Sequence, residues 1–295
     1  EHGADVEVIL REEGLLKKPF LNLFKIRKII SDCDIIHVFD VWPFGFLASV
    51  YAFGLDKKII ISAIGTYSIA PLYNFFLRML SLWAFRRAAK ITAISDYTAK
   101  EIKKIAADLE IIVLPNGVDF EKWSNRAGVF SEVSELRPYI LGVGGVKQRK
   151  GFHNSISAFA EIAQKFPKLK YVIVGQTNDD NYFKKLKNII NQRSLENKVV
   201  FLGSISDEKL NSLYENAELF ILTPEEHDHQ FEGFGLVYLE AAASSLPSIG
   251  SQQSGAETAI KEGISGVLVS QSDIHETALM IEKILSDNNF KNGNK

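Results

Sequence analysis

The chain has 295 residues, of which 46% are hydrophobic and 24% are charged, and its formal net charge at pH 7 is −2. This length is enough for two domains with separate cores, and the nearly balanced charge argues against nucleic acid as a partner. The single cysteine, Cys33, excludes an internal disulfide and fits a reducing compartment. We therefore expect a cytoplasmic protein, with the inner face of the membrane as an alternative place of action.

Short β-rich apolar runs alternate with helical patterns along the chain, which is typical of parallel sheets built from βαβ units. In the first half, strands are predicted at residues 6–10, 35–39, 58–62, 90–94 and 111–114, with an amphipathic helix near 20–31. Residues 59–77 carry no charge and have about the length of a membrane span. Because Gly65 and Pro71 interrupt this stretch, it is interpreted as a strand, a loop and the start of a helix.

The helix predicted at residues 72–89 combines five aromatic residues with three arginines. A helix at a membrane surface needs such a mixture. However, the apolar positions go most of the way round this helix, and that pattern favours a helix buried within its domain. Ser95 or Asp96 is expected to cap the next helix.

The chain is predicted to divide into an N-terminal domain at residues 1–125, a linker at 126–137 and a C-terminal domain at 138–295. The second half repeats the alternation of strands and helices. Its predicted strands lie at 139–143, 170–174, 198–202, 218–224, 246–250 and near 262–269, and its clearest helices at 207–216 and 274–285.

Glycines and cations follow the strand predicted at 139–143. Gly144 and Gly145 come directly after it, and Arg149 and Lys150 follow within the same loop. Glycines let the backbone approach a ligand closely, and Arg and Lys suit the charge that grows on a leaving phosphate. The loop is therefore a candidate for binding a diphosphate.

A second candidate is the segment 231–243, in which Gly233 and Gly235 precede a run that predicts a helix. The first amides of such a helix have no intrahelical partner and carry the positive end of its dipole, which suits a phosphate. Glu232 lies at the mouth of this loop. Glu240, just over one turn into the helix, has a side chain that tilts back toward the N-terminus. The two carboxylates suit hydroxyls on either side of a pyrophosphate, as in a nucleotide sugar.

These residues carry a resemblance to a known family. Glu232 to Glu240 matches the Glu, seven residues, Glu motif of retaining glycosyltransferases with the GT-B fold, and Glu-Gly-Phe-Gly-Leu followed by Leu-Glu-Ala resembles its wording in the family 4 group. Residues 112–119 resemble the strand and Pro-Asn-Gly-Val-Asp turn at which the family's first domain ends. The resemblance implies an α/β GT-B protein, with two Rossmann-like, doubly wound parallel-sheet domains facing a cleft. It also implies that the family's first strand and final helix are missing.

The implied reaction moves a hexose-type sugar from a nucleotide-diphosphate donor to a hydroxyl of a glycan, lipid-linked or small-molecule acceptor, with retention of configuration. Its catalytic residues are Glu232, which orients sugar hydroxyls, and Lys150 and Arg149, which neutralise the leaving diphosphate. The residues implied in donor binding are Gly144, Gly145, Ser204, Ile205, Gly233, Phe234, Gly235, Leu236 and Glu240. No metal and no cofactor other than the donor substrate is expected. Relatives that use lipid acceptors often touch the bilayer, so a peripheral membrane contact through the N-terminal domain is a further expectation.

The sequence departs from the family pattern at several positions. Ile64 stands where a histidine is usual, Gly145 where an arginine is common, and Ser254-Gly255 where a Gly-Gly pair is usual. Two alternatives therefore stay open: a protein that binds a nucleotide sugar without transferring it, and a nucleotide-sugar epimerase. His227 and His229, among acidic neighbours, have the residue types of a metal site, but a solvated loop is the favoured interpretation.

Overall fold

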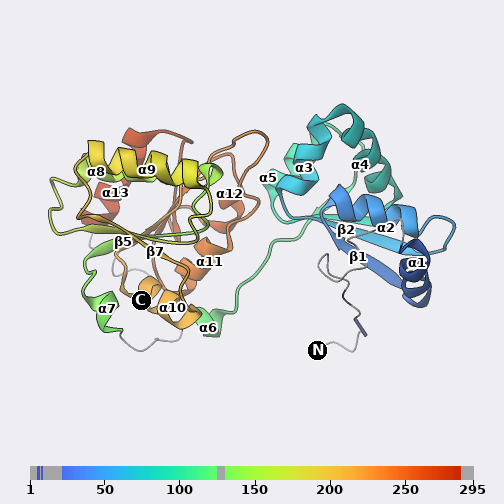
Figure 1. Cartoon of the computed structure of the whole chain (residues 1–295), viewed down its shortest axis with the longest axis horizontal. Coiled ribbons are helices and arrows are strands. Elements are labelled where there is room, and N and C mark those ends of the chain that lie inside the picture. The colour runs from blue at the N-terminus through green and yellow to red at the C-terminus, as the bar shows by residue number, and fades with distance from the viewer. Residues whose placement is uncertain (1–4, 7, 9–21, 125–129, 287–295) are drawn as a thin grey trace. The chain divides into compact units, whose positions relative to one another are not determined.

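The computed structural model describes residues 5, 6, 8, 22–124 and 130–286, so most of the strand expected at 6–10 lies outside the described residues. The chain forms two compact units (Figure 1). The first unit comprises Glu1–Ala93 and Ala99–Val113, and the second comprises Ile94–Thr98 and Leu114–Lys295. Each unit contains one sheet, and every strand pair in both sheets is parallel. The expectation of two α/β units with parallel sheets is confirmed.

The sheet of the first unit has four strands in the order β1-β2-β3-β4. They are β1 (Ile35–Phe39), β2 (Lys58–Ala63), β3 (Lys90–Ala93) and β4 (Ile111–Val113), each within one residue of the prediction. The accompanying helices are α1 (Leu23–Asp32), the π-turn η1 (Val41–Gly45), α2 (Phe46–Tyr51), α3 (Thr66–Tyr73), α4 (Phe75–Arg87) and α5 (Asp96–Lys103). The Ser95 hydroxyl accepts the Thr98 N–H at 3.1 Å, so Ser95 caps α5.

The sheet of the second unit has six strands in the order β10-β9-β8-β5-β6-β7. They are β5 (Tyr139–Val143), β6 (Lys170–Val174), β7 (Val199–Gly203), β8 (Leu219–Ile221), β9 (Ser248–Ser251) and β10 (Gly266–Val269). The helices are α6 (Phe120–Ser124), α7 (Ser131–Ser134), the 3-10 turn η2 (Gln148–Lys150), α8 (Phe152–Ile162), α9 (Asp180–Gln192), α10 (Asp207–Asn216), α11 (Leu236–Ala243), α12 (Ala256–Ala259) and α13 (Ile274–Ser286).

Helices cover both faces of this second sheet: α8, α9 and α13 lie on one face, and α10 and α11 on the other (Figure 1). Every residue of β5 and β8 is consequently buried. Strands covered on both faces have continuous apolar sequences, which is why β5, β6 and β8 could be recognised from the sequence. The polar end of the buried Tyr139 is satisfied, because its hydroxyl donates to the Leu213 carbonyl at 2.8 Å.

The single helix predicted at 72–89 is wrong, because the structure has two helices there. α3 and α4 meet at Asn74, whose backbone is extended. The Asn74 side-chain oxygen accepts the N–H groups of Phe76 and Leu77, each at 3.1 Å, and so caps α4. Asparagine is among the preferred N-cap residues, and this was the signal in the sequence.

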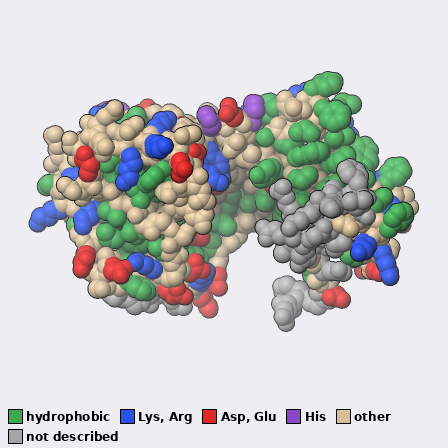
Figure 2. Space-filling model, in the orientation of Figure 1, with side chains coloured by type: hydrophobic (Ala, Val, Ile, Leu, Met, Phe, Trp, Pro, Cys, Tyr) green, Lys and Arg blue, Asp and Glu red, His purple; other side chains and the backbone are tan. Residues whose placement is uncertain are grey.

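The expected burial of this helix is wrong for one face of α4. Ala84 and Phe85 are buried, but Phe75 is 81% exposed, Phe76 68% and Met79 64%. Figure 2 shows hydrophobic side chains gathered on the surface of the unit that contains α4. An apolar pattern that runs round a helix does not reveal which face the rest of the domain covers. Within the part of the chain that the structure describes, no helix combines the length and the apolar character needed to cross a membrane.

Candidate functional site

Most of the predicted site residues gather at the carboxyl ends of β5 and β8, which are neighbours in the second sheet. From β5 the sheet continues outward through β6 and β7, and from β8 it continues through β9 and β10. The order of the strands therefore reverses between β5 and β8. Open parallel sheets bind ligands at such a point, beyond the carboxyl ends of the strands. The two glycine-containing loops predicted from the sequence leave the sheet at this place.

The loop after β5 packs closely against the loop after β8, because the backbones of Gly151 and Thr223 approach each other. Gly151 has a φ of 68°, and a Cβ added to it would lie 1.7 Å from the carbonyl oxygen of Thr223. Only glycine fits at this position. The Lys150 side chain folds back over Gly144, where an added Cβ would lie 3.5 Å from Lys150 Cε.

The loop after β8 turns into α11 through Gly235, which has a φ of 84°. A Cβ on Gly235 would lie 2.6 Å from the ring of Tyr238, and the Tyr238 hydroxyl donates to the Leu222 carbonyl at 2.6 Å. The buried tyrosine thus packs under the turn and ties it to the strand end. The first amides of α11, beginning at Leu236, lie beside this turn.

A second close contact fixes the start of the motif. The Gly255 N–H donates to the Glu232 carbonyl at 2.8 Å, and an added Cβ on Gly255 would lie 2.2 Å from the Gly233 backbone. The side chains of Phe231 and Phe234 are both buried. The loop that presents Glu232 is therefore packed from several sides.

Two cations converge on the Glu232 carboxylate. Lys150 Nζ forms an ion pair with Glu232 Oε2, and Arg149 Nη1 lies 3.4 Å from the same oxygen. Arg149 Nη1 also donates to the Phe231 carbonyl at 3.3 Å. The side chain of Glu232 is only 11% exposed, and a buried carboxylate needs such partners. The structure thus brings together the three residues that the sequence singled out for catalysis.

Glu240 has different surroundings. Its Oε2 accepts the hydroxyl of the buried Tyr214 at 2.8 Å. Burial raises the pKa of Glu240, and the Tyr214 hydrogen bond and the charge of Lys122 offset this only in part. Lys122 itself pairs with Asp207 at 2.7 Å. The carboxyl group therefore faces a neutral hydroxyl group rather than a directly bound cation.

Ser204 and Ile205 follow β7, and β6 separates β7 from β5. Ser204 is exposed, whereas Ile205 is half-buried and packs against the core. Both residues lie at the same end of the sheet as the glycine loops, because parallel strands place their carboxyl ends on one edge.

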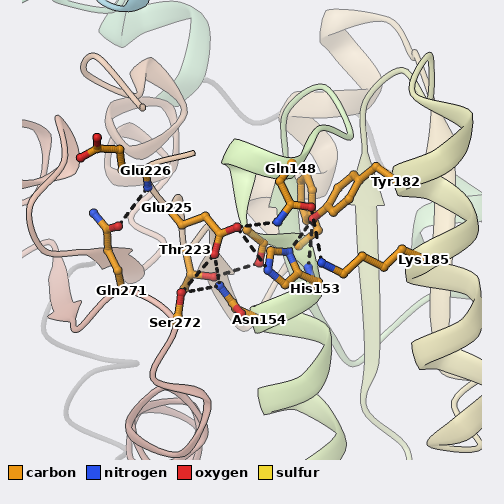
Figure 3. Close-up of polar contacts among 12 residues, drawn as sticks. Gln148, His153, Asn154, Tyr182, Lys185, Thr223, Glu225, Glu226, Gln271 and Ser272 are labelled. Atoms are coloured by element: carbon orange, nitrogen blue, oxygen red, sulfur yellow. Dashed lines mark hydrogen bonds and ion pairs between the residues drawn. The ribbon is translucent and has the colours of Figure 1, made fainter. Parts of the chain in front are cut away.

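A polar cluster around Glu225 was not predicted from the sequence. The Glu225 carboxylate accepts hydrogen bonds from Gln148 Nε2 at 2.6 Å, Asn154 Nδ2 at 3.0 Å and Ser272 Oγ at 3.1 Å (Figure 3). His153 Nε2 lies 3.3 Å from its Oε1. The residue follows the end of β8 by a few positions, and this placement was the available signal, but its partners come from distant parts of the chain.

The loop that contains His227 and His229 is closed by its own backbone. His227 N–H donates to the Gln230 carbonyl at 2.9 Å, and Gln230 N–H donates back at 2.8 Å. The side chains of His227, Asp228 and His229 are 52%, 85% and 45% exposed. Among the described residues there is no group of three or more His, Cys, Asp and Glu side chains placed to hold a metal ion.

Ile64, at the unusual position in the first unit, follows the end of β2 and is 41% exposed. Its backbone N–H donates to Asp40 Oδ1 at 3.0 Å, and the Ser68 hydroxyl donates to the same oxygen at 2.7 Å. Burial raises the pKa of Asp40. Asp40, which sequence reasoning missed, therefore organises the backbone at Ile64, where the family resemblance leads one to expect a histidine.

Comparison with known families gives matches over both halves of the chain. The family described as glycosyl transferases group 1 matches residues 129–293, and the family described as glycosyltransferase family 4 matches residues 4–122.

Similar proteins include an uncharacterized glycosyltransferase of Methanocaldococcus jannaschii, which is 30% identical over 54% of this chain and 38% of its own length. The capsular polysaccharide biosynthesis glycosyltransferase CapM of Staphylococcus aureus is 26% identical over 84% of this chain and 66% of its own length. A GDP-mannose-dependent phosphatidylinositol monomannoside mannosyltransferase of Mycolicibacterium smegmatis is 24% identical over 89% of this chain and 70% of its own length. The chain thus spans less than two thirds of the first two relatives.

Among solved structures, Anabaena HepE in complex with UDP and glucose is similar with a TM-score of 0.77 and 21% identity, over 96% of this chain and 76% of that one. A sucrose-phosphate synthase of Thermosynechococcus elongatus also has a TM-score of 0.77, with 20% identity, over 99% of this chain and 76% of that one. These likenesses confirm the expected GT-B fold class.

Proposed function

Because the chain belongs to the glycosyl transferases group 1 family, we propose that the protein is a retaining enzyme that transfers a hexose-type sugar from a nucleotide-diphosphate donor to an acceptor hydroxyl. The observation that supports this most directly is the convergence of Lys150 and Arg149 on Glu232 beside the N-terminus of α11. Two cations, a helix N-terminus and a buried carboxylate together suit a sugar diphosphate.

In the proposed reaction, the bond between the sugar C1 and the diphosphate oxygen breaks, and the acceptor oxygen bonds to C1 on the same face. The proton of the acceptor hydroxyl passes to the leaving phosphate. Lys150 and Arg149 stabilise the negative charge on that phosphate, and Glu232 orients the sugar hydroxyls. No second carboxylate is required as a base.

The remaining predicted residues have roles in holding the donor. The amides of Gly233, Phe234, Gly235 and Leu236 would bind phosphate oxygens, while Glu240 would accept a ribose hydroxyl. Gly144 and Gly145 would let the diphosphate approach the loop after β5. Ser204 and Ile205 would contact the base, a role that rests on the family resemblance alone.

Titration calorimetry of the 295-residue chain tests the donor assignment. The probes are UDP, GDP and ADP and their glucose or mannose conjugates, because HepE was solved with UDP and glucose and one relative is GDP-mannose-dependent. We expect one nucleotide to bind and Glu240→Ala to weaken it strongly. If a folded sample binds none of them, the proposed function is wrong.

The two alternatives are separated by products rather than by binding. A protein that only binds nucleotide sugars gives no turnover with any acceptor, and an epimerase converts the donor when no acceptor is present. Retention is tested by the anomeric configuration of the product, determined by NMR. A product with inverted configuration would contradict the proposed mechanism.

We also propose that the exposed face of α4 contacts a membrane surface, where a lipid-linked acceptor would lie. Phe75, Phe76 and Met79 form an apolar face on this helix, and aromatic side chains suit the boundary between lipid and water. Sedimentation with anionic phospholipid vesicles tests this contact. Phe75→Ser with Phe76→Ser should abolish binding, whereas Tyr67→Ser, which also alters an exposed aromatic, serves as control.

A further inference from the structure

The two cations that face Glu232 lie in a segment that cannot maintain its own geometry. Arg149 and Lys150 belong to η2, a 3-10 turn of only three residues, and short turns of this kind have few internal hydrogen bonds. The turn is followed at once by Gly151, the most permissive residue for the backbone. Contacts from outside η2 must therefore determine where the two cations point.

Part of this support comes from the backbone of the loop after β8. The Glu225 N–H donates to the Arg149 carbonyl at 3.1 Å, and the Thr223 hydroxyl donates to the Gly151 carbonyl at 3.3 Å. These two hydrogen bonds reach the residues on either side of Lys150. The loop after β8 thus holds the turn from which both cations extend.

The Glu225 side chain adds a second set of contacts on both flanks of the cations. Gln148, immediately before Arg149, donates to it, and His153 and Asn154 lie just beyond Gly151 (Figure 3). One carboxylate, only 13% exposed, therefore connects the start of η2 with the start of α8. The segment from Gln148 to Asn154 is linked to this carboxylate at both ends. The residues between these two links therefore have little freedom to move.

His153 lies between the hydroxyl of Tyr182 and the carboxylate of Glu225. The Tyr182 hydroxyl accepts the His153 backbone N–H at 3.2 Å and lies 2.9 Å from His153 Nδ1. His153 Nε2 faces the Glu225 carboxylate, which accepts a hydrogen bond when that nitrogen is protonated. Burial lowers the pKa of His153. Burial alone would raise the pKa of Glu225, but His153 and the three hydrogen bonds outweigh it and the net pKa is lowered.

We propose that Glu225 is a positioning residue, which holds η2 so that Arg149 and Lys150 face the donor diphosphate. The proposal rests on the proposed function, because it assigns those two cations to a diphosphate. In the described contacts, the Glu225 carboxylate does not contact the charged groups of Arg149 and Lys150. It acts through η2, the turn that contains these two residues.

Calorimetric titration of the 295-residue chain with UDP, GDP and ADP is the test. Glu225→Gln places an amide group among N–H donors, so it should disturb the turn and weaken nucleotide binding about tenfold, the scale of a lost hydrogen bond to a charged group. Asp228→Asn is the matched control, because it removes an 85% exposed carboxylate from the same loop and should bind like the unaltered chain.

A double-mutant cycle with Lys150→Met separates positioning from a general structural role. If Glu225 acts through the turn, adding Glu225→Gln to Lys150→Met should weaken binding much less than it does in the unaltered chain. Fully additive losses would overturn the proposal, as would unaltered binding by a folded Glu225→Gln protein. If no nucleotide binds even the unaltered chain, the proposed function fails and this inference fails with it.

Gln148→Met provides a second route if Glu225→Gln does not fold, as judged by circular dichroism. It removes one of the donors to Glu225 and leaves the carboxylate with His153, Asn154 and Ser272. We expect a smaller but measurable loss of nucleotide affinity without loss of the folded state. Unchanged affinity in this variant would contradict the proposed positioning role.

Discussion

The two carboxylates of the central motif are held in opposite ways. Glu232 faces two cations, Lys150 and Arg149, whereas Glu240 faces the neutral hydroxyl of Tyr214. At the first end, positive charge exceeds the negative charge it contacts, which suits a diphosphate that brings its own negative charge. At the second end, the buried carboxylate of Glu240 already accepts the Tyr214 hydroxyl, and such an acceptor suits a hydroxyl of a ligand. In the proposed donor site, the motif would thus have a charged end at Glu232 and a neutral end at Glu240, which faces a hydroxyl.

The largest effect on activity should come from a substitution at Glu232, the charged end of the motif. Glu232→Gln removes the carboxylate that both cations face, and we expect kcat/KM with the donor to fall by about a hundredfold or more, as for loss of one preorganised electrostatic contact. Steady-state kinetics with a nucleotide-sugar donor measure this. Asp228→Asn, which changes an exposed carboxylate of the same loop, should leave the kinetics unaltered. Equal activity of Glu232→Gln and the unaltered enzyme would remove the distinction between the two ends.

The packing that presents Glu232 can be tested through Gly255. A Cβ at this position would lie 2.2 Å from the Gly233 backbone, so Gly255→Ala should cost on the order of 1–3 kcal/mol of stability and weaken nucleotide binding. Thermal unfolding and calorimetry give the two values. Gly117→Ala is the control, because no heavy atom lies within 4 Å of its added Cβ. Equal melting temperatures for the two variants would contradict the close packing.

The stability of the folded protein should depend on pH through Glu240, the end of the motif that faces a neutral hydroxyl. Because burial raises the pKa of Glu240 above its ordinary value of 4.5, the folded protein binds this proton more tightly than the unfolded chain does. The contribution of this proton to the free energy of unfolding is fully present below the pKa of Glu240 in the unfolded chain. It is lost as the pH rises through the pKa of Glu240 in the folded protein. Glu240→Gln should therefore melt at a higher temperature than the unaltered protein at pH 7, and the difference should vanish at acidic pH.

Nucleotide affinity should change in the other direction in the same variant. The amide is a weaker acceptor for a ribose hydroxyl, so Glu240→Gln should bind UDP, GDP or ADP about tenfold more weakly. A variant that gains stability but keeps full affinity would show that Glu240 does not contact the donor.

The smallest effect is expected at Gly145, where the family resemblance leads one to expect an arginine. An added Cβ there has only Lys147 Cε within 4 Å, at 3.9 Å, so a longer side chain has room. Gly145→Arg should increase diphosphate affinity by a few fold, the scale of a solvent-screened ion pair. Gly145→Ala separates the effect of charge from that of the backbone. If Gly145→Arg leaves the affinity for the diphosphate unchanged, a third cation near Glu232 does not contribute to binding.

Several features of the site could be predicted from local sequence. Lys150, Arg149 and Glu232 lie in segments where glycines interrupt apolar runs, and such interruptions mark the ends of strands in parallel sheets. The boundaries of most strands were predicted within one residue, because the strands coincide with short β-rich apolar runs. The two-helix arrangement around Asn74 was missed, because an uninterrupted apolar pattern was given more weight than the capping residue.

What the sequence determined by itself is the set of elements and the positions of the glycines and charges between them, because hydrophobic periodicity and backbone freedom act over a few residues. Only the tertiary structure decided which charges meet. Glu225 is bonded to Gln148 and Asn154, which are 77 and 71 positions away in the chain, and it was interpreted from the sequence as one more acid of a solvated loop. Its partners become neighbours because β5 and β8 are adjacent in the sheet, and the order of strands in a sheet is decided by packing of the whole unit.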